Sequence, residues 1–340
     1  MKRSDDRFLI LDCLRGLAAL AVLIYHYTIR YHTLFIDHIR DIKGLGPDSF
    51  PFYYFGQVPV YLFFMISGFV IFLTVSRSRS IRDFMNRRFS RLYPAYWTAL
   101  TATTFVLVVF ASDYRNVSVE VFIMNLTMFQ GFLHVSYIDG VYWSLTVELS
   151  FYILIMVLMR FRLRERIELY LVIWSILVLG YAFMGVPNPI PYPIVYLLVL
   201  DYGHFFAAGI VFYRLWTHKT LSNYDRAVIA ISIVTIIIKY PVGVAAALLA
   251  LYAVFYAAVM EWLSFLAHPL LVWFGTISYA LYLVHQEIGY VIMQNLPLAY
   301  PVQVLVASTV AIALAAMITF LVERPAQRYL RTRLSKPKVV

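Results

Sequence analysis

The apolar residues of this chain are gathered into runs about as long as a membrane-spanning helix, and these runs constrain the fold more than any other feature. A helix needs about 20 apolar residues to cross the hydrocarbon layer. Of the 340 residues, 62% are apolar and 14% are charged, whereas soluble chains carry about one-quarter charged residues. We therefore predict an all-α, polytopic integral membrane helix bundle. Its ten expected spans lie near residues 9–28, 52–76, 93–112, 143–159, 169–186, 194–213, 227–238, 242–260, 269–293 and 302–322.

The basic residues between these runs indicate which side of the membrane each connection occupies. With ten spans, 22 Lys and Arg fall on the side of the N-terminus and 5 on the opposite side, and Arg15 lies within a span. Cytoplasmic loops carry the excess of basic residues. We therefore expect a multi-pass protein of the plasma (inner) membrane with both termini in the cytoplasm. A single transmembrane domain is expected over residues 1–330, followed by a basic cytoplasmic tail over residues 331–340, with no appended soluble domain.

Charge and cysteine content exclude several other classes of protein. The net charge of +10 does not indicate nucleic-acid binding, because the basic residues stand in short clusters between apolar runs, so anionic lipids and anionic cofactors are the expected partners. Cys13 is the lone cysteine and cannot form an intramolecular disulfide. The first apolar run carries Asp12, Arg15 and His26 and lacks a small-residue cleavage site, so we expect a retained span. We find no phosphate-binding glycine loop and no Cys and His spacing for a metal.

Arg15 and His26 stand out in the first span because ionisable groups at membrane depth are costly. They are eleven residues apart, which on an α-helix is three turns plus roughly 20°. Both therefore project from one face, about 16 Å apart. This face presents a fixed cation toward the cytoplasmic half and a titratable imidazole toward the outer half. The alternative is that His26 caps the span at the interface.

Further polar side chains are expected at the depth of His26, in the outer half of the bundle. They are Glu148 in the fourth span, Asp201 and His204 in the sixth, and His285 and Glu287 in the ninth. Intramembrane ionisable groups usually face a cavity or a partner, so with His26 they suggest a polar pocket. A carboxylate beside an imidazole suits a general base that acts on a hydroxyl. Structural hydrogen bonding between helices is the alternative for these residues.

A basic segment from Arg77 to Arg91 lies on the expected cytoplasmic side. Arg88 and Arg91 are about one helical turn apart, so two guanidinium groups can converge on one phosphate. The alternative is positive charge that contacts lipid head groups. Tyr93 and Pro94 follow and are expected to mark the turn into the third span.

These residues fall into motifs that resemble one family of integral membrane proteins, acyltransferase family 3, along nearly the whole chain. The motifs are LDCLRGLAALAVLIYHY from residue 11, YLFFMISGFVIFL at 61–73, RRFSRLYPAYW at 87–97, YWSLTVELSFY at 142–152, SYALYLVHQ at 278–286 and ERP at 323–325. Six motifs in register with ten spans make the resemblance specific. It implies that residues 1–330 form an acyltransferase domain.

The resemblance implies transfer of an acyl group, commonly acetyl, from cytoplasmic acyl-CoA to a carbohydrate hydroxyl. The essential histidine of the family corresponds to His26, its arginine partner to Arg15, and its cytoplasmic arginine pair to Arg88 and Arg91. We expect His26 to act as a base or a transient acyl carrier, and Glu148 or another carboxylate to orient it. Arg15 would stabilise negative charge along the donor path. Acetyl-CoA is the expected donor and co-substrate, and no metal is expected.

Four residues of the expected pocket are assigned to the acceptor: Tyr142, Trp143, Asp201 and His285. A continuous tunnel should join this outer pocket to the cytoplasmic half, which holds Arg15, Arg88, Arg91 and Glu323. A transporter or flippase of a lipid-linked or anionic substrate is the alternative function, since intramembrane ionisable residues are expected there too. An unrelated membrane acyltransferase with an embedded histidine is a third. An oligomer remains open.

Overall fold

The chain is helical throughout the part that the structure describes. A computed structural model describes residues 5–31, 34, 54–111, 116–161, 166–185 and 189–334. Within these ranges there are helices and turns and no strand. The predicted all-α class is therefore confirmed.

Seven helices in the described residues are long and apolar enough to cross a membrane, which supports the predicted multi-pass protein. Their count falls short of ten, and the remaining three spans stay predictions. The seven are Leu9–Arg30, Val58–Arg77, Ile81–Phe110, Gly140–Arg160, Ile167–Met184, Val242–Val259 and Tyr300–Arg333.

Two of the remaining spans were predicted as continuous helices, and this was wrong. The sixth, at 194–213, is divided into α7 (Tyr192–Leu197) and α8 (Gly203–His218). Between them Val199 has a φ of 52°, which a β-branched residue seldom adopts in a helix or strand. The indole of Trp174 donates to the carbonyl of Leu198 (2.8 Å) and so satisfies a group that the interruption leaves exposed. The ninth, at 269–293, is interrupted at His285, and the seventh is contained in α9 (Asn223–Lys239).

The expected turn at Pro94 was also wrong, because α3 runs through it as one helix from Ile81 to Phe110. A proline inside a helix removes one backbone hydrogen bond. Packing compensates here, since Ala95, Tyr96 and Ala99 directly after it are fully buried. Thirty residues of helix span about 45 Å, which is longer than the hydrocarbon layer. The first turns of α3, which carry the arginines, can therefore extend beyond the hydrocarbon layer.

The residues form two compact units, each assembled from distant parts of the sequence. The first comprises Met1–Ala18, Gln57–Ile81 and Ser144–Val272, and the second comprises Ala19–Gly56, Arg82–Trp143 and Trp273–Val340. Neither corresponds to a continuous stretch of sequence. The single domain over residues 1–330 stays a prediction.

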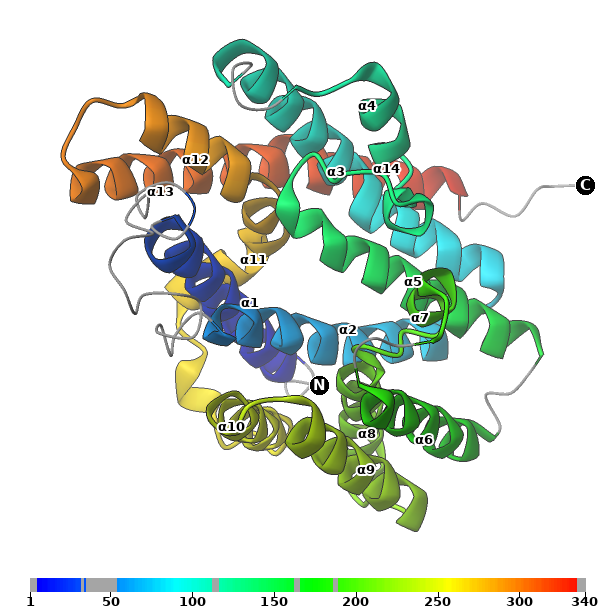
Figure 1. The fold of residues 1–340 in the computed structure, drawn as a ribbon. Coiled ribbons are helices and arrows are strands. Elements are labelled where there is room, and N and C mark those ends of the chain that lie inside the picture. The colour runs from blue at the N-terminus through cyan, green and yellow to red at the C-terminus, as the bar shows by residue number, and fades with distance from the viewer. Residues whose placement is uncertain are drawn as a thin grey trace, which may run out of the picture. The chain divides into compact units, whose positions relative to one another are not determined.

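In the first unit, α2 packs closely against α8 (Figure 1). A Cβ at Gly68 would overlap the backbone of Phe206, and a Cβ at Gly209 would overlap the backbone of Met65. Small residues allow helix backbones to approach in this way in membranes. The helices of this unit that lie wholly within it are α2 (Val58–Arg77), α6 (Ile167–Met184), α7, α8, α9 and α10 (Val242–Val259). Most of α5 (Trp143–Arg160) and the start of α1 (Asp5–Tyr25) also belong to it.

In the second unit, α12 and α13 lie side by side, drawn in orange in Figure 1, and α12 contacts the π-helical turn η1 that follows α1. Short irregular turns join or extend its longer helices. The elements that lie wholly within this unit are η1 (His26–Arg30), α4 (Val119–Asn125), η4 (Gln130–Leu133), η5 (Gly140–Tyr142), α12 (Gln286–Asn295), α13 (Tyr300–Met317), η8 (Ile318–Glu323) and α14 (Arg324–Leu334). Most of α3 and most of α11 (Pro269–Val284) also belong to it.

Candidate active site

His26 lies where the first helix changes from α-helical to π-helical geometry, at the start of η1. Its Nδ1 is 3.0 Å from the carbonyl of Val22, and the hydroxyl of Thr28 donates to the carbonyl of Ile24 (2.6 Å). Side chains that insert into the hydrogen-bond ladder distort a helix. Single π-helical turns are frequent at functional sites. The imidazole is half-buried and so stays partly accessible.

His285 lies at the interruption between α11 and α12, and its side chain is buried with 1% of its surface exposed. Side chains take up the carbonyls around this bend. The Nδ1 of His285 is 2.9 Å from the carbonyl of Tyr282, the hydroxyl of Tyr142 donates to Leu283 (3.2 Å), and the hydroxyl of Tyr27 donates to His285 itself (2.6 Å). Because unsatisfied carbonyls are costly in a membrane, these bonds make the bend stable.

The two histidines are in direct contact. The Nε2 of His285 lies 3.0 Å from the Nδ1 of His26, and the ring centroids are 4.8 Å apart at an interplanar angle of 63°. The residues are separated by 259 positions in the sequence. The structure thus brings together, in the second unit, two of the residues that were expected to share a polar pocket.

Asp139 supports this site from the loop before α5. Its carboxylate accepts from the backbone N–H of Val141 (3.1 Å) and from that of Glu287 (3.2 Å), so one buried side chain caps both η5 and the start of α12. The sequence analysis missed Asp139. The Asp139-Gly140 pair ahead of a helix was an available signal, since Asp favours such turn and cap positions.

Tyr142 and Trp143 were both predicted to contact the acceptor. Tyr142 is fully buried, and its hydroxyl is engaged at the bend beside His285. Trp143 is half-buried at the first position of α5. Tyr142 therefore has a supporting role in the fold, and the contact of either residue with an acceptor stays a prediction.

The two predicted donor arginines have different surroundings. Arg91 forms an ion pair with Glu323, whose side chain is 1% exposed, and its guanidinium lies 5.7 Å from the centre of the Tyr279 ring. Arg88 lies with its guanidinium 5.9 Å from the centre of the Phe84 ring. The ion pair brings Arg91 and Glu323 together, whereas their expected position in the cytoplasmic half and phosphate binding by either arginine stay predictions.

Three other predicted site residues belong to the first unit. Arg15 pairs loosely with Asp12 one turn away on the same helix (3.7 Å). Asp201, which was predicted to bind the acceptor, pairs with Lys239 at the end of α9 (2.8 Å). The lysine compensates the charge of the carboxylate.

Glu148, also in the first unit, is half-buried in α5. One of its carboxylate oxygens accepts from Ser67 of α2 (2.8 Å) and from Tyr152 one turn further along (2.7 Å). Both bonds hold the carboxylate in a fixed orientation. Its proposed role in orienting His26 stays a prediction.

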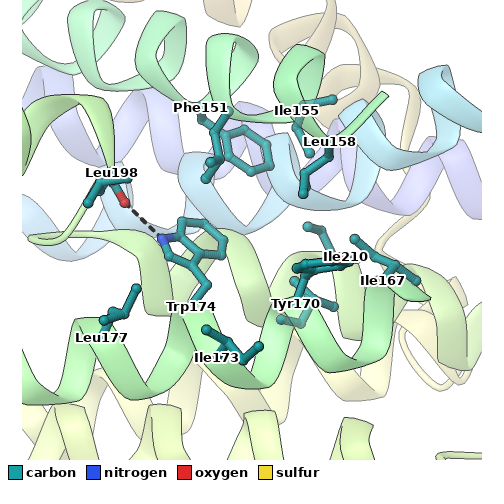
Figure 2. A pocket seen from close by; sticks show the side chains of 12 residues that line it. Phe151, Ile155, Leu158, Ile167, Tyr170, Ile173, Trp174, Leu177, Leu198 and Ile210 are labelled. Carbon is teal, nitrogen blue, oxygen red and sulfur yellow. Dashed lines mark hydrogen bonds between the residues drawn. The ribbon is translucent and has the colours of Figure 1, made fainter. Parts of the chain in front are cut away.

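A groove in the first unit, between α5 and α6, has a volume of about 150 Å³ (Figure 2). Figure 2 shows that Phe151, Ile155 and Trp174 line it, with the Trp174 indole turned to the carbonyl of Leu198. Apart from the side chains of Tyr170 and Trp174 the groove is lined by aliphatic residues and Phe151, so its surface suits apolar chains.

Comparison with known proteins identifies the family. Residues 8–320 match the acyltransferase 3 family, described as an acyltransferase domain. Neither the curated proteins nor the solved structures gave a match to the chain. The match covers every residue assigned above to the candidate site except Glu323, and five of the six sequence motifs fall within it, the ERP motif at 323–325 lying just beyond its end. The chain therefore belongs to the acyltransferase 3 family.

Proposed function

We propose that this protein is a membrane O-acyltransferase that moves an acyl group, acetyl being the expected one, from cytoplasmic acyl-CoA to a hydroxyl of a cell-surface or lipid-linked carbohydrate. The observation that carries the proposal is the contact between His26 and His285 within the family's matched region. Two imidazoles brought together at a helix interruption supply a base and a partner for it. Membership of an acyltransferase family favours this function over the transporter alternative.

In the proposed reaction, His26 accepts the proton of the acceptor hydroxyl as the hydroxyl oxygen attacks the thioester carbonyl carbon. The tetrahedral intermediate then collapses, the carbon–sulfur bond breaks, and the leaving sulfur takes the proton from His26. The products are the O-acyl ester and free CoA, and the imidazole returns to its starting state. General-base catalysis of this kind contributes about 10²- to 10⁴-fold to rate. Arg15 would stabilise negative charge that develops along the donor path.

The donor would approach from the cytoplasmic side, where the early turns of α3 carry the arginines. Arg88 and Arg91 are both candidates for the phosphates of acetyl-CoA, and Arg91 would share its guanidinium between a phosphate and Glu323. Guanidinium groups bind phosphates through charge-assisted, often bidentate, hydrogen bonds. The inner-membrane location with both termini in the cytoplasm follows from the distribution of basic residues and belongs to the same proposal.

The test is release of CoA by the purified protein in lipid nanodiscs supplied with acetyl-CoA and a candidate glycan acceptor. The wild-type protein should release CoA in step with the appearance of O-acetyl signals in the glycan NMR spectrum. His26→Ala should abolish both while the protein elutes as a folded species. His218→Ala, at the exposed end of α8, is the matched control and should be active. A fully active His26→Ala protein would refute the role of His26.

A further inference from the structure

The hydrogen-bond acceptors around the two histidines determine where their protons lie. The Nδ1 of His285 is 2.9 Å from the carbonyl of Tyr282 and 3.2 Å from that of Leu281. A carbonyl oxygen can only accept a hydrogen bond, so this nitrogen must carry a proton. In the neutral ring, the Nε2 of His285 is then an unprotonated acceptor.

That acceptor faces the Nδ1 of His26 at 3.0 Å. Two nitrogen lone pairs at this distance would repel each other, so the Nδ1 of His26 carries the proton and donates it. The carbonyl of Val22, 3.0 Å from the same nitrogen, is a second acceptor and favours the same tautomer. The Nε2 of His26 is therefore left unprotonated.

We infer that His285 is a positioning residue that holds the proton of His26 on Nδ1 and leaves Nε2 of His26 as the base for the acceptor hydroxyl. The inference rests on the proposed function and deepens it, because it assigns the orienting role to a buried imidazole where a carboxylate was expected. His26 is the half-buried member of the pair, so it is the ring that a substrate can reach, and His285 acts through it.

The same contact serves the charged state of the reaction. When His26 has taken the proton of the acceptor, both of its nitrogens carry protons. The Nδ1–H still donates to His285 and to the carbonyl of Val22, so the ring does not rotate between the two proton transfers. The interruption of the helix at His285, stabilised by Tyr27 and Tyr142, places this acceptor.

The first test measures the tautomer directly and does not depend on activity. Protein labelled with ¹⁵N-histidine in nanodiscs is examined by solid-state NMR, and the His26 signals are identified by their loss in His26→Gln. Wild-type His26 should show a protonated Nδ1 and an unprotonated Nε2. His285→Phe removes the acceptor. Signals of the other His26 tautomer, which carries its proton on Nε2, should then appear beside those of the first. His218→Phe, which replaces an exposed histidine, should leave the His26 signals unchanged.

The second test separates positioning from a purely structural role through kinetics. His285→Phe should lower kcat by on the order of 10²-fold, within the range that a general base contributes, and leave the KM for acetyl-CoA within about twofold of wild type. His285→Gln places an amide oxygen near the former Nε2 and should restore kcat to within about tenfold of wild type. Both variants are checked for folding by thermal unfolding.

Either of two results would overturn the inference: a wild-type His26 that carries its proton on Nε2, or a folded His285→Phe protein with wild-type kcat. If His285→Phe does not fold, the wild-type tautomer and the His285→Gln kinetics decide. If wild-type protein releases no CoA with any acceptor, the proposed function fails, and the NMR measurement still decides whether His285 sets the tautomer.

Discussion

Arg91, which is half-buried, forms an ion pair with the buried Glu323 and so joins α3 to the end of the π-helical segment η8. The Glu323 carboxylate also accepts a hydrogen bond from Gln327 (3.1 Å). The arginine therefore compensates a carboxylate that has almost no access to solvent. A donor phosphate would have to share Arg91 with Glu323, so Arg88 and Arg91 should respond differently to substitution.

Arg91→Ala is expected to destabilise the protein by about 3–5 kcal/mol, because removing one partner leaves a buried charge without compensation. Thermal unfolding of the detergent-solubilised protein measures the change. Arg91→Met combined with Glu323→Leu removes both charges and should recover most of the stability. A loss of donor affinity by Arg91→Ala with unchanged stability would contradict this account.

Arg88→Ala is expected to raise the KM for acetyl-CoA about 10- to 100-fold, because a charge-assisted hydrogen bond contributes about 1.5–3 kcal/mol. The KM for the acceptor should change much less. Steady-state CoA release at varied donor concentration measures the effect. Arg82→Ala, an exposed arginine on the first turn of the same helix, is the control for general surface charge. Equal effects of both substitutions would indicate lipid contact by Arg88.

The helical class and most spans were predictable because a membrane helix is specified locally by an apolar run of sufficient length. The interruption at His285 was not. The one proline of the run 269–293 is Pro269 at its start, far from the break, and the nearest glycine, Gly289, lies beyond the break. The bend depends on tyrosine hydroxyls that arrive from residues 27 and 142. Such contacts are set by tertiary packing and leave no local signal.

The residues of the candidate site were predictable from the sequence, whereas the contacts between them were less so. His26 was identified because an ionisable side chain at membrane depth is costly in free energy. His285 was identified from its expected depth in the ninth span. Their direct contact joins residues 259 positions apart, which one sequence without related sequences does not reveal. A carboxylate partner was the expectation for His26, since carboxylates commonly orient catalytic imidazoles. In the structure the partner of His26 is His285. The backbone carbonyls at the bend hold His285 in place.

The sidedness of the loops gives a third prediction. Ser80→Cys, between α2 and α3, should react with a membrane-impermeant maleimide in inverted vesicles and not in right-side-out vesicles. Leu298→Cys, between α12 and α13, should show the reverse pattern. Both positions are exposed, and the native Cys13 is fully buried, so the background should be low. Labelling of both sites from the same side would refute the ten-span arrangement.

The fourth prediction concerns Gly289, which lies one turn beyond the bend at His285. A Cβ at this position would overlap the ring and hydroxyl of Tyr27. That ring is fully buried, and its hydroxyl is bonded to the carbonyl of His285. The ring therefore cannot move away without breaking a bond that stabilises the bend. Gly289→Ala should destabilise the protein by about 1–3 kcal/mol through overpacking, and it should lower kcat by displacing His285.

Gly180→Ala is the matched control, because a Cβ at Gly180 in α6 meets nothing within 4 Å. Replacing glycine by alanine inside a helix without a clash stabilises it by about 0.5–1 kcal/mol. The two substitutions should therefore shift the unfolding temperature in opposite directions, and only Gly289→Ala should reduce CoA release. If Gly289→Ala has the unfolding temperature and the rate of CoA release of wild type, then Tyr27 does not hold the bend in the way its contacts indicate. The positioning of His285 would in that case have to come from Asp139 and Tyr142 alone.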